Sequence, residues 1–418
     1  MLRSCVQVLT YEMAKDTPSW LNLELVENIM RKNDNSIRVL NMFTKPATAK
    51  GDNYTSDMYR VSIEISCKRG DEEVTKKKSL IVKVAPTGEN IKKELIEKSR
   101  IFHTEISMMT DTLKKMNNLL GPAHFISGRV FYIQKEHPEF LVMEDLAPLG
   151  FRMADRQAGL DLPHCLLAIR GLARFHASSI AVCEKEPNHK KFYTRGIFSS
   201  EHPPEIMNFF ILATKSLGME MRKWPDFEKY AEKVDKFAEK IYDKTAEAMK
   251  CREDEFNVIN HGDFWVNNMM FRYNDEGKPI DHIFVDFQMC VYGSPANDLQ
   301  YFLNTSADND VYENNQDMLL EEYLLTLSNM MKQFDCKTIP LTMEKLRKNL
   351  KEREIVAMTS SFTILPLVLL DKNEAKDLDE IMGKDGNEYN SSAFENELYR
   401  KVISKRISIY DQLGLMDL

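Results

Sequence analysis

The stretch HGDFWVNNMMF, residues 261 to 271, sets a histidine, an aspartate and two asparagines among apolar residues. His261 and Asp263 are followed by Asn268, five residues after the aspartate, and a second aspartate, Asp286, stands in VDFQ further along. This spacing matches the kinase pattern H-x-D-x-x-x-x-N with a later aspartate in the place of D-F-G. Phosphoryl transfer needs one carboxylate that accepts a hydroxyl proton, and an amide with a second carboxylate that hold magnesium.

These residues therefore receive separate predicted roles. Asp263 is the predicted base because a carboxylate is ionised at neutral pH, and His261 is expected to orient the loop. Asn268 and Asp286 are the predicted ligands of Mg²⁺. Asp and Asn are also common turn residues, so the loop taken alone could simply shape a turn. Trp265, within the loop, is expected either to line the acceptor site or to pack between the lobes.

A lysine on an apolar strand supplies a candidate phosphate ligand. In the expected strand 79–85, Ile81 and Lys83 share the face opposite three aliphatic residues. Lys83 is predicted to pair with the α- and β-phosphates of a nucleotide, whereas the competing interpretation is a solvated lysine on an edge strand. Glu105, in the next expected helix, is its predicted ionic partner, and Glu94 and Glu97 are weaker rivals.

Two further segments are expected to contact the nucleotide. The segment 49–61 has one glycine among small and polar residues and could place backbone N–H groups over phosphates, although a plain surface loop explains it nearly as well. The segment MEDL, residues 143 to 146, is expected to be the hinge whose backbone edge meets adenine. The predicted nucleotide contacts are Lys83, Glu105, Gly51, Asn53, Ser56, Ile81, Glu144 and Leu146.

The character of the chain changes near residue 147. Before it, period-two alternation from Tyr59 to Cys67, the strand 79–85, a helix over 89–117 and two strands joined at His137-Pro138-Glu139 predict a small antiparallel sheet with one main helix. After it, helical periodicity prevails, and only residues 256–287 read as strands. The expected helices span residues 163–182, 204–250, 311–334, 342–373 and 391–413.

These elements predict an α+β fold with two lobes. We expect an N-terminal helical extension over residues 1–35, a nucleotide-binding N-lobe over 36–146, and a helical C-lobe over 147–418 that carries the catalytic loop and the acceptor site. In the C-lobe, the segment 205–221 is rich in Met and Phe and could form an apolar wall for a substrate, although ordinary helix core is the favoured interpretation. Asp298 and His176, in apolar helical surroundings, are expected to be hydrogen-bonded structural residues.

Bulk composition excludes several classes of function. A chain of 418 residues with 43% hydrophobic content can bury a large core, and a net charge of -8 gives no basic surface for nucleic acid or for an anionic membrane. The N-terminus lacks the apolar core of a signal peptide and the longest apolar run, Phe362 to Leu370, is too short to span a bilayer, so we expect a cytoplasmic protein. Seven scattered cysteines without a CxxC pair predict reduced thiols, mostly in the core, and no zinc site.

Several motifs together resemble the insect ecdysteroid kinase-like family, also called CHK kinase-like, which is related to choline kinases and aminoglycoside phosphotransferases. The motifs are HGDFWVNNMMF, FVDFQMCVYGSPANDLQYFL, GDNYTSDMYRV, IVKVAP and LVMEDL, and the resemblance runs from about residue 20 to the C-terminus. It implies a two-lobed protein-kinase-like fold that uses ATP and Mg²⁺ to phosphorylate a small-molecule hydroxyl. It also implies Asp263 as the base, Asn268 and Asp286 as metal ligands, and Lys83 with Glu105 as the phosphate-holding pair.

The chain departs from protein kinases at two places. Gly262 stands where they carry an arginine, and only eleven residues separate Asp286 from Asp298, with no A-P-E sequence between them. This leaves little room for a peptide-docking segment, so a small-molecule alcohol is the expected acceptor. The resemblance favours an ecdysteroid or a related steroid or xenobiotic. A choline- or ethanolamine-type kinase is the alternative, and a catalytically inactive ligand-binding protein is a third possibility, which the intact motif residues disfavour.

Overall fold

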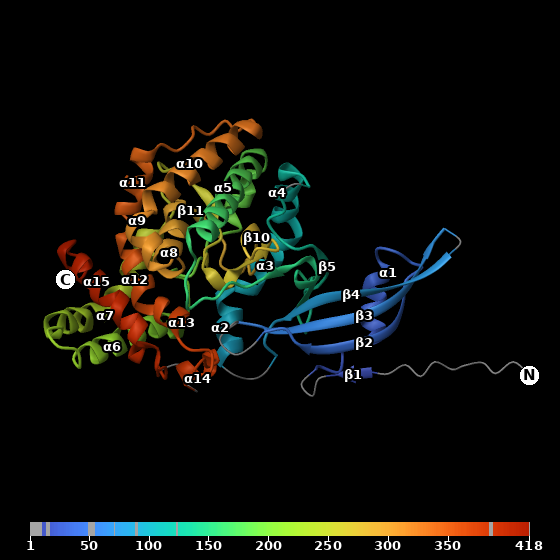
Figure 1. Ribbon diagram of the computed structural model, residues 1–418, viewed down its shortest axis with the longest axis horizontal. Helices are drawn as coiled ribbons and strands as arrows, with labels where there is room; N and C mark the ends of the chain where they lie inside the picture. The colour runs from blue at the N-terminus through green and yellow to red at the C-terminus, as the bar shows by residue number, and fades with distance from the viewer. Residues whose placement is uncertain are drawn as a thin grey trace, which may run out of the picture. The chain divides into compact units, whose positions relative to one another are not determined.

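The computed structural model describes residues 11–13, 17–48, 55–70, 72–87, 91–122, 124–383 and 388–417. The chain divides into two compact units, one made of the described residues within 1–87 and 128–149, the other of those within 88–127 and 150–418. The first unit is built on a sheet and the second is mainly helical, as the predicted α+β class requires (Figure 1). The predicted nucleotide contacts Gly51 and Asn53 lie outside the described residues.

The N-terminal unit is a six-stranded sheet with the strand order β1-β2-β3-β4-β6-β5. The pair of β1 with β2 is parallel, and the other pairs are antiparallel. One helix, α1, packs on the sheet within this unit, so the predicted extension 1–35 contributes a helix to the lobe instead of standing apart from it. The elements are β1 (Tyr11–Met13), α1 (Leu23–Arg31), β2 (Arg38–Pro46), β3 (Asp57–Arg69), β4 (Glu72–Val84), β5 (Val130–Gln134), β6 (Phe140–Glu144) and the short turn η2 (Ala147–Leu149).

Strand β3 confirms the predicted alternation: Val61, Ile63 and Ile65 are buried in a core that they share with α1. Strand β4 begins at Glu72, well before the predicted start at Ser79. Its first half is rich in exposed lysines, so no apolar pattern marks it, yet its backbone pairs with β3 along the whole length of both strands. The backbone ladder, and not the side chains, determines where this strand begins.

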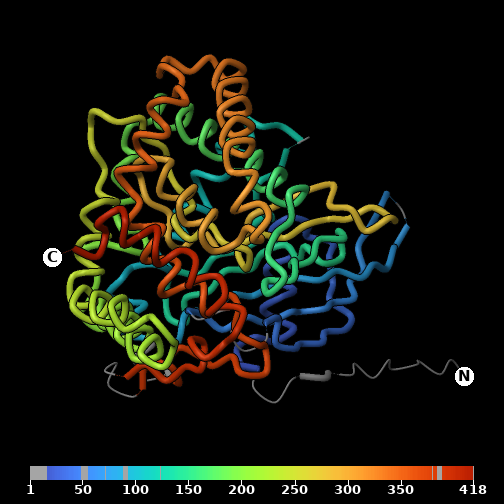
Figure 2. The backbone as a smooth tube through the Cα atoms, turned by 60° about the vertical axis from the view of Figure 1, so that its left-hand side comes forward, coloured from blue at the N-terminus to red at the C-terminus, as the bar shows by residue number. Residues whose placement is uncertain are grey.

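The C-terminal unit surrounds the long buried helix α5 with other helices. Helix α10 lies beside α5, and α6 and α7 form a second adjacent pair (Figures 1 and 2). Two small sheets, β10-β9-β7 and β11-β8, lie in the same unit. After the segment 91–120, the elements are β7 (Phe151–Arg152), α5 (Leu162–Lys185), η3 (Pro187–Lys191), α6 (Pro204–Met221), α7 (Glu228–Met249), β8 (Val258–Asn260), η4 (Val266–Asn268), β9 (Met269–Tyr273), β10 (Pro279–Phe284), β11 (Val291–Gly293), α8 (Ala296–Thr305), α9 (Asn309–Asn314), α10 (Gln316–Gln333), α11 (Met343–Lys351), α12 (Glu354–Thr363), α13 (Leu365–Leu369), α14 (Leu378–Met382), η5 (Ala393–Glu395) and α15 (Glu397–Gln412).

The helix predicted over residues 89–117 is interrupted and belongs to the C-terminal unit. Helix α2 (Ile91–Ser99) ends at Arg100, whose φ of 58° is left-handed, and α3 (Ile101–Ser107), a π-turn (Met108–Thr112) and α4 (Leu113–Leu120) follow. Helix α4 packs against α5, and the hydroxyl of Thr112 hydrogen-bonds Tyr193 at 2.5 Å. The observed units therefore differ from the predicted boundaries 36–146 and 147–418, because this helical stretch packs on helices of the larger unit.

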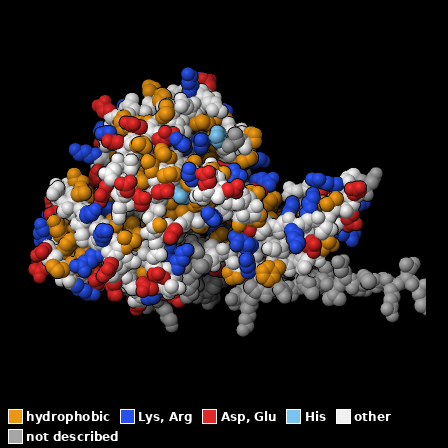
Figure 3. Space-filling view, viewed as in Figure 1, with side chains coloured by type: hydrophobic (Ala, Val, Ile, Leu, Met, Phe, Trp, Pro, Cys, Tyr) orange, Lys and Arg blue, Asp and Glu red, His pale blue; other side chains and the backbone are white. Residues whose placement is uncertain are grey.

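Helix α5 is the structural centre of the C-terminal unit. By length and apolar composition it could cross a membrane, but 78% of its most apolar window is buried within the protein, as in a core helix. The cysteines among the described residues are all free, and Cys67, Cys165, Cys183 and Cys290 are buried, which agrees with the predicted reduced thiols. Figure 3 shows basic and acidic side chains interspersed over the visible face.

Strand β10 carries a histidine that the fold keeps neutral. His282 packs against Phe284, with ring centroids 4.6 Å apart, and against Phe271 at 5.2 Å. A Cβ added to Gly171 of α5 would lie 2.7 Å from Nδ1 of His282, so this glycine lets the helix approach the ring closely. Burial, helped by the charge of Arg174, lowers the pKa of His282 to about 3.

This depressed pKa predicts acid-sensitive stability. Between pH 6.5 and about 3 the unfolded chain binds a proton at His282 that the folded chain excludes, so the free energy of unfolding falls as the pH drops through that window. The contribution is about 1.4 kcal/mol per pH unit below 6.5, and it vanishes above that pH. Urea unfolding at pH 7.5, 6.5 and 5.5 should show a shallower pH dependence for His282→Gln than for the wild type. Equal slopes would contradict the prediction.

Candidate active site

The hairpin of β9 and β10 brings the two halves of the kinase-like pattern together. Strand β8 leads into the loop 261–268, and β9 and β10 then pair from Met269 opposite Phe284 outward. At the base of the hairpin, the backbone N–H of Val285 donates to the carbonyl of Asn268 at 3.0 Å. Asp286 follows immediately, in a left-handed conformation with φ 65°. The hairpin thus returns Asp286 to the neighbourhood of the loop that contains Asp263.

The carboxylate of Asp263 is held on both oxygens. The hydroxyl of Tyr301 donates to Oδ1 at 2.8 Å, and Nδ2 of Asn268 donates to Oδ2 at 2.7 Å and to the backbone carbonyl of Asp263 at 2.9 Å. Because the amide nitrogen of Asn268 is committed to Asp263, its carbonyl oxygen is the atom left for a cation. Asp263 as a whole residue is partly exposed, while both carboxylate oxygens accept hydrogen bonds.

The pKa of Asp263 is set by two opposing influences, burial beside a second carboxylate and hydrogen bonds from nearby donors. Burial and, after it, the negative charge of Asp286 raise the pKa of its carboxyl to about 7, against the opposing effect of hydrogen bonds from Tyr301, Asn268 and Trp265. Burial keeps the pKa of Tyr301 well above its ordinary value, so this hydroxyl stays a donor. A carboxyl whose ionisation is disfavoured by the charge of a second carboxylate marks a place where a bound cation would be stabilising.

Asp298, on α8, anchors the backbone of the loop. Its carboxylate is 1% exposed and accepts the N–H of His261 at 2.7 Å and the N–H of Gly262 at 2.8 Å. His176 of α5 lies 3.1 Å from the same carboxylate through Nε2, and 2.8 Å from the hydroxyl of Tyr323 through Nδ1. Burial lowers the pKa of His176, so the neutral ring donates to Asp298 and accepts from Tyr323. These bonds agree with the hydrogen-bonded structural role predicted for Asp298 and His176.

His261 joins the loop to the segment before Asp286. Its ring is fully buried, and Nε2 lies 3.1 Å from the carbonyl of Val285, to which it donates. Burial lowers the pKa of His261, so the ring is neutral. The ring thus joins the loop to the backbone of Val285, and the predicted role of His261 in orienting the loop stays a prediction.

Gly262 is required by the path of the loop. Its φ is +81°, and a Cβ at this position would lie 1.8 Å from the carbonyl oxygen of Met289. Any other residue would therefore meet both a left-handed backbone and a direct overlap. The loop can pass so close to the segment after Asp286 only because residue 262 has no side chain.

The residues present fit a magnesium ion that is shared with phosphate oxygens. Among the residues that the structure describes, no group of three or more His, Cys, Asp or Glu side chains could form a metal site by itself. Asn268 and Asp286 offer one amide oxygen and one carboxylate. Mg²⁺ usually binds in this way, through one or two protein ligands with substrate phosphates and waters completing its octahedron.

Among the predicted phosphate and nucleotide contacts in the N-terminal unit, Ile81 and Lys83 share one face of β4, whereas Glu144, which pairs with Leu80, lies on the other face of the sheet. Strand β4 pairs with β3 and β6 on its two sides, and Lys83 is 2% exposed, so the edge-strand interpretation of this lysine is wrong. Ile81, two residues earlier on the same face, is 8% exposed, and Ser56 is also buried. Glu105 is buried on α3, which belongs to the other unit, so its pairing with Lys83 stays a prediction.

Asp145, directly after β6, hydrogen-bonds to residues of β3 and β4, and the sequence analysis predicted no individual role for it. Asp145 is 4% exposed and accepts hydrogen bonds from Nε of Arg60 at 2.8 Å and from the hydroxyl of Ser79 at 2.6 Å. Its neighbour Glu144 pairs with Arg129 at 2.7 Å, and Leu146 is buried. No local signal could have indicated the pair of Arg60 and Asp145, because the two residues are far apart in the sequence.

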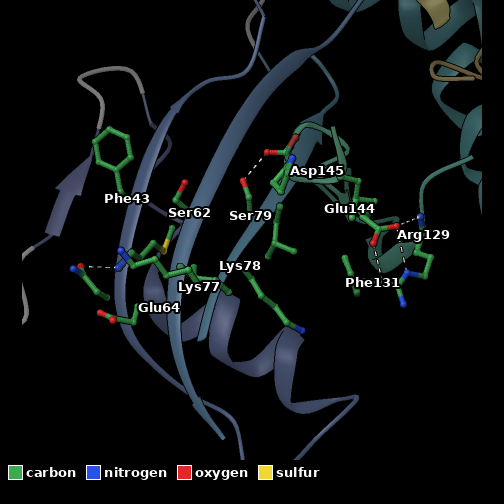
Figure 4. A pocket seen from close by; sticks show the side chains of 16 residues that line it. Phe43, Ser62, Glu64, Lys77, Lys78, Ser79, Arg129, Phe131, Glu144 and Asp145 are labelled. Atoms are coloured by element: carbon green, nitrogen blue, oxygen red, sulfur yellow. Dashed lines mark hydrogen bonds and ion pairs between the residues drawn. The ribbon is translucent and has the colours of Figure 1, made fainter. Parts of the chain in front are cut away.

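A cavity of about 660 Å³ opens on this part of the N-terminal unit (Figure 4). Ser62 and Ser79, which pair across β3 and β4, lie in its wall, together with Glu144 and Asp145. Ile81 and Lys83 do not line it, because they lie further along β4. Of the predicted nucleotide contacts in this unit, Glu144 is the one that borders this cavity.

Tyr301 is the residue of the Asp263 environment that the sequence interpretation missed. It stands three positions after Asp298 on α8, and this spacing places both side chains on one face of a helix. A polar residue in the stretch NDLQYFL that shares a face with Asp298 was therefore a usable signal. What the sequence did not reveal is that this face meets the loop of Asp263.

Comparison with known proteins adds a family match. The sequence profile of the Ecdysteroid kinase-like family matches residues 50–336. No curated protein matches the chain. Among solved structures, a fructosamine-3-kinase from Haemophilus somnus 129PT has 9% identity and a TM-score of 0.32, covering 79% of this chain and 96% of its own. The streptomycin-ATP-APH(2")-IIa ternary complex has 15% identity and a TM-score of 0.35, covering 84% of this chain and 98% of its own. Scores this low support no conclusion about activity.

Proposed function

This chain belongs to the ecdysteroid kinase-like family, and on that premise we propose that it transfers the γ-phosphoryl group of ATP, with Mg²⁺, to a hydroxyl of an ecdysteroid or a related steroid or xenobiotic alcohol. Family membership supports the coarser statement that the protein is a small-molecule kinase with a hydroxyl acceptor. The nucleotide, the metal and the class of acceptor belong to the proposal.

One observation carries the proposal. The carboxylate of Asp263 is oriented by Tyr301 and Asn268, and the charge of Asp286 is close enough to raise its pKa. The loop itself is fixed by the buried carboxylate of Asp298. A base, an amide oxygen and a second carboxylate, all positioned before any substrate arrives, are the groups that phosphoryl transfer requires.

In the proposed reaction, Asp263 receives the proton of the acceptor hydroxyl. The hydroxyl oxygen forms a bond to the γ-phosphorus while the bond from phosphorus to the β-bridging oxygen breaks, which yields a phosphate monoester and ADP. Tyr301 and Asn268 hold the carboxylate in the orientation that this transfer needs. The hydroxyl must lie within hydrogen-bond reach of Asp263 for the proton to pass.

The metal ion and Lys83 are proposed to bind the phosphate groups of the nucleotide. Bound between Asn268, Asp286 and the nucleotide, Mg²⁺ would neutralise charge on the phosphate oxygens. Its positive charge would also favour the ionised form of Asp263, opposing the effect of Asp286 on the pKa of that carboxyl. Lys83 is proposed to hold the α- and β-phosphates from the N-terminal unit.

The test is ATP consumption with and without Mg²⁺ across a panel of ecdysteroids, phenolic glycosides, choline and ethanolamine, with the phosphorylated product identified by mass spectrometry. We expect turnover that EDTA abolishes and that ecdysteroids or related alcohols stimulate more than amino alcohols. Stimulation by choline or ethanolamine alone would transfer the assignment to the alternative kinase. Absence of ATP consumption with every acceptor would leave only the inactive ligand-binding alternative.

A matched pair of variants distinguishes loss of a metal ligand from disturbance of the hairpin's structure. Asp286→Asn removes the predicted carboxylate ligand, so it should raise the Mg²⁺ concentration needed for half-maximal activity by about tenfold or more, as losses of metal-site residues do. Asp275→Asn, in the exposed turn at the tip of the same hairpin, should leave that concentration unchanged. An equal effect of the two substitutions would contradict the assignment of Asp286.

A further inference from the structure

The turn between the predicted base and the predicted metal ligand Asn268 is held from outside by a serine. The backbone N–H of Val266 donates to Oγ of Ser306 at 3.0 Å. Val266 and Ser306 are each 1% exposed, so this bond is shielded from water. Val266 begins the 3₁₀ turn η4, which ends at Asn268. The bond to Ser306 therefore fixes the start of the turn that presents the amide of Asn268.

The hydroxyl of Ser306 has a well-defined position. Ser306 follows directly after α8, its N–H donates to the carbonyl of Phe302 at 2.9 Å, and its carbonyl accepts the N–H of Leu160 at 2.8 Å. The first N–H groups of a helical turn have no partner within that turn, so Val266 depends on an acceptor from elsewhere in the fold. Ser306 supplies that acceptor from a backbone that is itself fixed on both sides.

The neighbouring Thr305 gives the Ser306 hydroxyl one direction. The hydroxyl of Thr305 donates to the carbonyl of Tyr301 at 2.7 Å, and its oxygen lies 3.1 Å from Oγ of Ser306. A hydroxyl has a single proton, so Thr305 is the acceptor in the second contact and Ser306 is the donor. The lone pairs of Ser306 are thereby left for the N–H of Val266. The serine is set as an acceptor toward the loop before any ligand binds.

Tyr301 and Ser306 hold different parts of the loop. Tyr301 donates to Oδ1 of Asp263, the predicted base. Ser306 accepts from the backbone at Val266, two residues before the predicted metal ligand Asn268. Because Val266 and Asn268 belong to one three-residue turn, a displacement of the first residue moves the third. The contact of Ser306 therefore concerns the metal ligand, whereas the contact of Tyr301 concerns the base.

We propose that Ser306 is a positioning residue for the metal: by accepting the N–H of Val266, it holds η4 where the side-chain oxygen of Asn268 can reach Mg²⁺. This role rests on the proposed function and adds to it a residue that touches neither metal nor substrate. Mg²⁺ demands near-ideal octahedral geometry. Residues that hold metal ligands from behind commonly change metal affinity by about 10- to 100-fold when they are replaced.

The test is Ser306→Ala, with Mg²⁺ titrated into the protein and ADP and the bound nucleotide measured by calorimetry. We expect the Mg²⁺ concentration for half-maximal effect to rise about tenfold, while the affinity for ADP in EDTA stays within about 2-fold of the wild type. Ser178→Ala is the matched control. Ser178, on α5, is equally buried, and its hydroxyl donates to the carbonyl of Phe175 in its own helix at 2.9 Å. It should change neither quantity.

Steady-state kinetics with an ecdysteroid separate this role from a general structural one. Ser306→Ala should raise the Mg²⁺ concentration for half-maximal turnover about tenfold. At saturating Mg²⁺, the acid limb of its kcat profile against pH should coincide with that of the wild type. Tyr301→Phe should behave in the opposite way, because Tyr301 lowers the pKa of the Asp263 carboxyl. Its acid limb should move to higher pH, with the Mg²⁺ requirement within about 2-fold of the wild type.

Two further variants isolate the acceptor oxygen. Ser306→Thr keeps the hydroxyl and should keep the Mg²⁺ requirement within about 3-fold of the wild type. Ser306→Cys keeps the approximate shape of the side chain and replaces the oxygen by a weakly accepting sulfur, so it should raise the requirement as Ser306→Ala does. The cysteine variant provides the decisive measurement if the alanine variant fails to fold.

The outcomes are distinct. A wild-type Mg²⁺ requirement in the alanine and cysteine variants would overturn the proposal and leave Ser306 as a structural residue. An equal rise in Ser178→Ala would also overturn it, because the loss of any buried hydroxyl would then suffice. If the wild type consumed no ATP with any alcohol but bound ADP more tightly with Mg²⁺, the proposed function would fail while the ADP titration still decided the role of Ser306. If Mg²⁺ had no effect on ADP binding, both would fail.

Discussion

Asp263→Asn should lower kcat by about a thousandfold while ATP binds within about 2-fold of the wild-type affinity, because a general base contributes on the order of 10² to 10⁴ to the rate. The amide cannot accept the hydroxyl proton, but it can replace the carboxylate in its hydrogen bonds, since the hydroxyl of Tyr301 can either donate or accept. The loop should therefore keep its shape. Steady-state kinetics and calorimetric titration with ATP measure the two quantities.

The same variant should be at least as stable as the wild type at neutral pH. The folded-state pKa of Asp263 is raised to about 7, so between its ordinary value and pH 7 the folded chain holds a proton that the unfolded chain has lost. Ionised Asp263 is therefore unfavourable for the folded state as the pH rises, and Asn removes this penalty. A loss of activity with retained stability is the pattern expected at a functional site.

Asp281→Asn is the control for this substitution. Asp281 lies on β10 of the same hairpin and pairs with Arg272 at 2.6 Å on an exposed surface, where an ion pair contributes little. Its kcat should stay within about 2-fold of the wild type, as for a surface change away from the site. Near-normal turnover in Asp263→Asn would remove Asp263 from its role as base, whereas a parallel loss in both variants would point to damage of the hairpin.

Gly262→Ala should destabilise the protein by about 4 kcal/mol and abolish activity, which places it among the most severe single substitutions. The left-handed φ of +81° costs an alanine about 1 to 2 kcal/mol. The overlap with the carbonyl of Met289, only 1.8 Å from the new Cβ, costs the rest, because the segment after Asp286 must move. Urea unfolding measures the stability, and the activity should be lost even at temperatures where the variant remains folded.

Gly277→Ala separates the two contributions. Gly277, in the turn between β9 and β10, has a φ of +78°, nearly that of Gly262, but a Cβ there would meet nothing within 4 Å. This variant should lose only the conformational part, about 1 to 2 kcal/mol, and keep its activity. If the two substitutions cost the same, the close approach of Met289 would not limit the side chain at position 262.

The sequence identified the elements that carry the site better than it identified their limits. The strand 59–67 and the helix 163–182 appear as β3 and α5, because in both cases an apolar face repeats at the period of the element. The start of β4 and the breaks in the helix 89–117 were missed. Neither feature leaves a periodic signal in the sequence. The start of the lysine-rich strand β4 is set by its pairing with β3. The break at the left-handed Arg100 occurs in a helical stretch whose later part packs on α5.

By itself, the sequence determined which side chains could perform phosphoryl transfer, because a base, an amide and a second carboxylate at fixed spacing suit few other reactions. Only the tertiary structure decided how they are held. Tyr301 reaches Asp263 from α8, and Asp298 holds the backbone of the loop. Such contacts join positions that are distant in the chain, so they depend on which helix faces meet. That choice is made by burial over the whole core, and no local pattern of residues records it.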